Sequence, residues 1–148
     1  MIGELDTLWT AAGVIFGFEA TAFLWRINRE VSIADRGAQT GLWAADYLNI
    51  AAMVAIGGGV FVLPILGVGD ADLAASWLGL SVVLLAGHAF ATAGHYGFFD
   101  PSSPRPRRVP NDPQSSVHPF PRQEKVAVYG TVALAVAYIV AAILWGAV

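Results

Sequence analysis

The chain has 148 residues, of which 56% are hydrophobic and only 13% are charged, and its mean hydropathy is +0.60. This composition is too apolar and too sparsely charged for an ordinary soluble domain, so it predicts a single membrane domain spanning residues 1–148. The net charge of -3 means little as an average, because acidic and basic residues are sorted to different places along the chain, and we expect no nucleic-acid partner. The absence of cysteine excludes disulfides, thiolate metal sites, iron–sulfur clusters and cysteine nucleophiles.

Four hydrophobic runs follow one another along the chain, at residues 7–25, 43–66, 73–96 and 126–147. Each has the length of roughly 18–20 residues that a helix needs to cross the apolar core of a bilayer. The fourth run has only Tyr129 and Tyr138 as ionisable groups, so we expect it to face lipid. The runs therefore predict an all-α integral membrane protein, a four transmembrane helix bundle.

All basic residues fall in two hydrophilic segments, residues 26–40 and 98–125. They are Arg26, Arg29, Arg36, Arg105, Arg107, Arg108, Arg122 and Lys125. Because positively charged loops stay on the cytoplasmic side during insertion, we expect both segments inside the cell and both termini outside. A single Lys alongside abundant Ala and Gly indicates a prokaryote with a GC-rich genome, and hence the plasma membrane.

Small residues and proline mark where the helices should pack or bend. Gly13 and Gly17 have the small-xxx-small spacing that lets membrane helices approach closely. The run Gly57-Gly58-Gly59 followed by Pro64 predicts a bend or a local loosening in the outer half of the second span, since Gly lowers helix stability and Pro removes a backbone hydrogen bond.

The segment at residues 98–122 contains seven of the eight prolines, which predicts turns and polyproline II structure on the cytoplasmic face. Within it, Arg105, Arg107 and Arg108 form a basic cluster. We expect this cluster to contact lipid headgroups or a partner, or to act only as the charge that fixes topology.

Ionisable and amide side chains enter the expected spans in the half nearest the basic segments. They are Glu19, Asp46, Asn49, His88 and His95. Intramembrane carboxylates and imidazoles are costly unless they are paired or hydrated, so these residues are the candidate binding or proton-relay site. In a purely structural role, Glu19 would pair with His88 and Asp46 with His95.

The favoured functional interpretation is a non-catalytic accessory or structural subunit that associates with itself or with a larger membrane complex. The sequence contains no recognisable catalytic triad or phosphate loop and predicts no extramembrane domain. The interpretation requires no cofactor and names no catalytic residue.

Three alternatives use the same residues differently. A proton- or cation-coupled transporter is suggested because Glu19 in the first of four helices resembles the membrane glutamate of small multidrug exporters, although those are shorter and lack this loop charge bias. A haem b-binding electron-transfer subunit, or a protein with a divalent metal, would use His88 or His95, which lie about 10 Å apart along a helix and therefore cannot both bind one ion.

The third alternative is a membrane enzyme. Ala38-Gln39 followed by Asp46-Tyr47-Leu48-Asn49 resembles the Asn and Glu pattern at the start of the second helix in membrane-associated eicosanoid and glutathione metabolism proteins. The resemblance implies four spans, termini outside and a site toward the cytoplasm. This sequence lacks the basic residues that define that family in the second and third spans, so the likeness concerns architecture.

Overall fold

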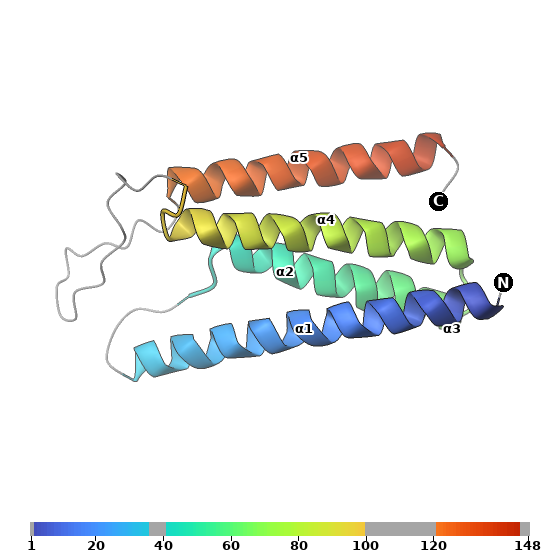
Figure 1. Cartoon of the computed structure of the whole chain (residues 1–148), viewed down its shortest axis with the longest axis horizontal. Helices are drawn as coiled ribbons and strands as arrows, with labels where there is room; N and C mark the ends of the chain where they lie inside the picture. Colours follow the sequence, from blue (N-terminus) through green and yellow to red (C-terminus); the bar gives the residue numbers. More distant parts are fainter. Residues whose placement is uncertain (1, 36–40, 100–120, 146–148) are drawn as a thin grey trace.

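The structure, a computed structural model, describes residues 2–35, 41–99 and 121–145. The described residues are helical apart from short connections (Figure 1). The helices are α1 (Ile2–Ala34), α2 (Ala44–Val54), the π-helix η1 (Ala55–Val62), α3 (Leu63–Ile65), α4 (Ala71–His95) and α5 (Arg122–Leu144). Because α2, η1 and α3 follow one another without a break, they form one continuous rod.

Four of these helical segments are long enough and apolar enough to cross a membrane. They cover Leu5–Ala34, Ala44–Ile65, Ala71–His95 and Arg122–Leu144, with 30, 22, 25 and 23 residues. At about 1.5 Å of rise per residue, each spans the roughly 30 Å of a bilayer core. The prediction of an all-α chain with four such helices is confirmed.

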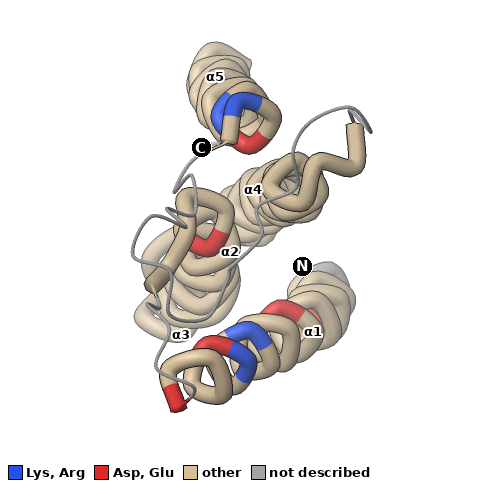
Figure 2. Tube along the Cα trace, turned by 90° about the vertical axis from the view of Figure 1, so that its left-hand side faces the viewer, with Lys and Arg blue, Asp and Glu red and all other residues tan. Residues whose placement is uncertain are grey.

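The four rods run alternately up and down, with α4 at the centre of the bundle (Figure 1). It packs against α5 on one side and against α1, α2 and η1 on the other. Among the described residues, α1 and α5 do not touch each other, and the end-on view places them on opposite sides of the bundle (Figure 2). We call the end where α4 finishes and α5 begins the Trp43 end.

Two helices extend further than the sequence suggested. α1 continues to Ala34, through a segment expected to be a hydrophilic loop from Arg26 onward. An ion pair between Arg26 and Glu30, one turn apart, supports this extension. α5 begins at Arg122 instead of residue 126, directly after Pro121, which lacks the N–H that a helix start leaves unpaired. Both differences bring charged residues onto helices.

The prediction of a loosened second rod is confirmed by the π-helix η1, which contains all three consecutive glycines. Pro64 has no N–H to offer the carbonyl of Val60, one turn earlier. The indole N–H of Trp9 on α1 donates to that carbonyl instead, at 2.9 Å. The irregular backbone is thereby fastened to the neighbouring helix.

Glycines on α4 set the close approach of α5, in place of the glycines expected on α1. A Cβ added to Gly87 would lie 2.1 Å from the Thr131 side chain, and one added to Gly94 would lie 2.9 Å from the backbone of Gln123. Gly13 and Gly17 are exposed, with no atom within 4 Å of an added Cβ, so the prediction of a packing pair there is wrong.

Candidate functional site

Polar side chains from all four rods meet at the Trp43 end of the bundle. The group, which we call the Trp43 cluster, consists of Arg26, Glu30, Trp43, Asp46, His95 and Glu124. Figure 2 looks onto this end and shows acidic residues on the near turns of α1, α2 and α5 and basic residues on α1 and α5.

The cluster is organised around the indole of Trp43, the residue that precedes α2. The His95 ring stacks on it, with centroids 3.3 Å apart and planes at 18°. The guanidinium carbon of Arg26 lies 4.0 Å from the Trp43 ring centroid. Two groups so close to one ring cannot occupy the same face, so Trp43 is sandwiched between α1 and α4. The stack combines a cation–π contact with an aromatic contact.

Glu124 joins α5 to the cluster. Its carboxylate is fully buried; Oε2 lies 2.6 Å from Nδ1 of His95, and Oε1 accepts a hydrogen bond from the backbone N–H of Ala45 at 3.2 Å. This N–H belongs to the first turn of α2, where helix donors have no partner within the helix. One carboxylate therefore fastens the ends of three helices.

Asp46 fixes the start of α2 and the position of Arg26. Its Oδ2 accepts the backbone N–H of Trp43 at 2.7 Å, and its Oδ1 lies 3.4 Å from Nε of Arg26. Arg26 also pairs with Glu30 on its own helix. In this cluster one guanidinium thus faces two carboxylates, and both are mostly buried.

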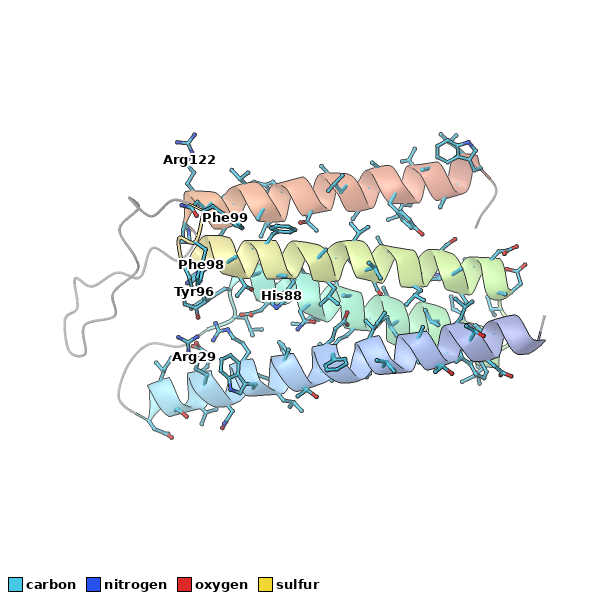
Figure 3. The ribbon with its side chains drawn as sticks, viewed as in Figure 1. Arg29, His88, Tyr96, Phe98, Phe99 and Arg122 are labelled. Atoms are coloured by element: carbon cyan, nitrogen blue, oxygen red, sulfur yellow. The ribbon has the colours of Figure 1, made fainter. Side chains whose placement is uncertain are left out.

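His88 lies half-buried two turns deeper on α4, between α4 and α2 (Figure 3). Its Nδ1 is 2.8 Å from the carbonyl oxygen of Ala45. A carbonyl oxygen only accepts hydrogen bonds, so the proton of this bond is on Nδ1. The N–H of Ala45 goes to Glu124 and its carbonyl to His88, which means that α5 and α4 each hold the first turn of α2.

Arg29 and Tyr96 lie together at the rim of the Trp43 end (Figure 3). The guanidinium of Arg29 donates to the Tyr96 hydroxyl and lies 5.5 Å from the Tyr96 ring centroid. The Tyr96 ring in turn meets Trp43 edge-on, with centroids 5.9 Å apart. This contact extends the cluster to the surface along α1.

Glu19 and Asn49 are buried but stand apart from these pairs. Each is 1% exposed. Both carboxyl oxygens of Glu19 and the amide oxygen of Asn49 lack a hydrogen-bond partner among the described residues. An unmet buried polar group costs roughly 1–3 kcal/mol, more when it is charged, so these oxygens need a partner.

The structure therefore divides the candidate residues into two groups. Asp46, His88 and His95 lie around the first turn of α2, whereas Glu19 and Asn49 lie deeper. The expected pairs of Glu19 with His88 and of Asp46 with His95 are wrong, because His95 pairs with Glu124 and Asp46 with Arg26.

Sequence reasoning missed Glu124, Arg26 and Trp43. The fourth span was started at residue 126, which left Glu124 in the loop, although Pro121 before Arg122-Gln123-Glu124 is typical of a helix start. Trp43 entered the prediction only as the first residue of the second hydrophobic run. Arg105, Arg107 and Arg108 lie outside the described residues.

No three His, Cys, Asp or Glu side chains come close enough to hold a metal ion in the described ranges. The haem and metal hypotheses at His88 and His95 therefore stay predictions. In comparisons with known proteins, no family model, no curated protein and no solved structure matches the chain.

Proposed function

We propose that this chain is a small, non-catalytic integral membrane subunit that associates with itself or with a larger membrane complex. The observation that carries the proposal is the Trp43 cluster, in which His95, Asp46 and Glu124 are engaged in contacts between helices. Groups used in this way hold the bundle together and leave little for chemistry on a substrate.

The outer faces of α1 and α5 are apolar, which indicates that they contact lipid or a partner within the membrane. Large apolar side chains are exposed along both helices, including Phe18 at 74% on α1 and Leu134 at 64% on α5. Exposed apolar surface of this extent is unstable in water. In a membrane such a surface contacts lipid or another helix, and the quality of side-chain packing determines which of the two contacts is more stable.

As part of the same proposal, the Trp43 end faces the cytoplasm of a prokaryotic cell, and both termini lie outside. The support is the confinement of all Lys and Arg to the segments that flank this end. Because the chain has no cysteine, single cysteines at Asp70 and at Asp35 can be labelled in intact cells with a membrane-impermeant thiol reagent. We expect labelling at residue 70 and none at residue 35; the reverse pattern would contradict the orientation.

Site-specific photocrosslinking tests the subunit role. A photoreactive amino acid at exposed Leu134 or Phe18 should give protein adducts of discrete mass in native membranes, and the same group at buried Ala135 serves as the control. Adducts with a second copy or with another membrane protein are the expected result. Adducts with lipid alone from both exposed positions would refute the proposal.

A second candidate function is proton- or cation-coupled transport, favoured by the buried and unpartnered carboxylate of Glu19. In proteoliposomes, Glu19→Gln should abolish ion-driven flux if the chain is a transporter. A subunit with no transport role shows no flux before or after the change, and it responds through its assembly or thermal stability.

A further inference from the structure

α1 and the rod made of α2 and η1 face each other along two rows of largely buried residues, which we call the α1–α2 seam. On α1 the row includes Ala12, Glu19 and Arg26, spaced seven residues apart and so on one helix face. On the second rod, Asp46 and Asn49 lie one turn apart on one face. Asp46 of this row meets α1 through Arg26.

Two contacts fix the register of the seam. Trp9 donates to the carbonyl of Val60 near one end, and Arg26 meets Asp46 near the other. Glu19 lies between Trp9 and Arg26 on α1, slightly nearer Arg26, and the corresponding level on the second rod is that of Ala52. Asn49 is one turn away from this level, about 4–5 Å along the axis. Glu19 and Asn49 thus share one seam at nearly one depth.

Three unmet atoms in this seam are acceptors when Glu19 is ionised, namely its two carboxylate oxygens and the amide oxygen of Asn49. One donor of the seam, Nη2 of Arg26, is also unmet, and it belongs to a residue seven positions from Glu19, about 10 Å away along the helix. Nε1 of Trp77 on α4 is unmet as well, whereas three other side chains use donors elsewhere. Arg26 is paired with Asp46 and Glu30, His88 Nδ1 is bonded to the Ala45 carbonyl, and the Ser81 hydroxyl donates to the Leu78 carbonyl. Buried oxygens without a partner, two of them from a carboxylate, are ligands that a small hard cation requires.

The backbone beside the seam is also unusual. The π-helix begins at Ala55, about one turn beyond the level of Glu19. Gly57 faces α1, because an added Cβ would lie in ordinary van der Waals contact with the Phe16 ring, at 3.8 Å. π-Helical turns are frequent at functional sites because they displace the backbone from its regular path. The seam therefore combines buried oxygens that lack a partner with a neighbouring π-helical backbone.

We propose that Glu19 and Asn49 form a buried binding site for a small monovalent cation, a proton or a sodium ion. A proton on Glu19 turns one oxygen into a donor that the amide oxygen of Asn49 can accept; a sodium ion takes both side chains as oxygen ligands. For the second candidate function, transport, this proposal names the ion and the residues that bind it, but the site does not require transport. Binding without flux would keep the cation site and remove the transporter.

Infrared difference spectroscopy of the full chain in lipid membranes tests the proposal, because it detects a protonated carboxyl without requiring a reagent to reach it. The C=O stretch that disappears in Glu19→Gln belongs to Glu19, and Asp6→Asn, which removes an exposed carboxyl from the same helix, is the matched control. Buffers that differ in pH, or that exchange choline for sodium at constant pH, report the two cations separately.

A Glu19 band that fades as pH rises, without a sodium effect, identifies a proton site. A band that is lost when sodium replaces choline identifies a sodium site. In either case Asn49→Leu, or Asn49→Ala if the larger residue prevents folding, should shift the midpoint by about tenfold in cation concentration. A Glu19 band that is absent throughout, that responds to neither cation, or whose midpoint is unchanged in the Asn49 variant would overturn the proposal.

Discussion

Glu124 is the residue whose loss should damage the bundle most, and Glu124→Leu tests that expectation. The change removes the carboxylate from His95 and from the backbone N–H of Ala45, both of which are inaccessible to a replacement partner from solvent. Hydrogen bonds between membrane helices contribute roughly 0.6–2 kcal/mol each, and orphaned buried groups cost about 1–3 kcal/mol. Two such losses predict a decrease of about 2–4 kcal/mol in the free energy of unfolding.

The measurement is equilibrium unfolding in mixed micelles of a mild detergent with increasing sodium dodecyl sulfate, followed by circular dichroism. Arg122→Leu, an exposed change two residues away on α5, is the control and should alter the unfolding free energy by less than about 0.5 kcal/mol. If Glu124→Leu costs no more than Arg122→Leu, the carboxylate is not what holds α5 to α2 and α4. The role assigned to the Trp43 cluster would then be wrong.

Three further changes probe neighbouring contacts in the same assay. Gly94→Ala places a Cβ 2.9 Å from the backbone of Gln123 and should destabilise the fold by about 1–3 kcal/mol. Its control is Gly130→Ala, where an added Cβ has open space, and this change should be neutral or slightly stabilising. Equal losses of unfolding free energy in the two variants would contradict the close packing of α5 at Gly94. Trp43→Leu should cost about 1–3 kcal/mol from the two stacked partners and Trp25→Leu much less, because Trp25 is 66% exposed. Asp46→Ala removes the carboxylate that accepts the backbone N–H of Trp43 and contacts Arg26, and should cost about 0.5–2 kcal/mol. An unchanged unfolding free energy would refute this role of Asp46 at the start of α2.

The coarse fold was predictable because hydrophobic length alone specifies it. Apolar runs of membrane-spanning length cannot satisfy their backbone groups in lipid except as helices, which is why the four spans were found. Pro64 and the preceding glycines likewise predicted the loosening of the second rod that the π-helix η1 shows, because their effect on backbone hydrogen bonding is local. Features that depend on neighbouring residues along the chain could therefore be predicted from the sequence.

The partners of each polar side chain were not predictable for a different reason. The sequence placed His95 and Asp46 in the same half of the membrane, but position along a span carries no information on which helix faces which. α5 lies against α4 because Gly87 and Gly94 leave room for it, and this contact brings Glu124 to His95. The Trp43 cluster could be predicted only by combining two features, the packing glycines on α4 and the charged first turn of α5.

The proposed subunit role is tested most directly by the mass of the intact particle. The chain, carrying an affinity tag, would be extracted from its native membranes in a mild detergent and weighed by native mass spectrometry. The account predicts a particle of fixed stoichiometry heavier than one 15.6 kDa chain, containing further copies or another membrane protein. A particle with the mass of a single chain, under conditions where helicity is retained, would contradict it.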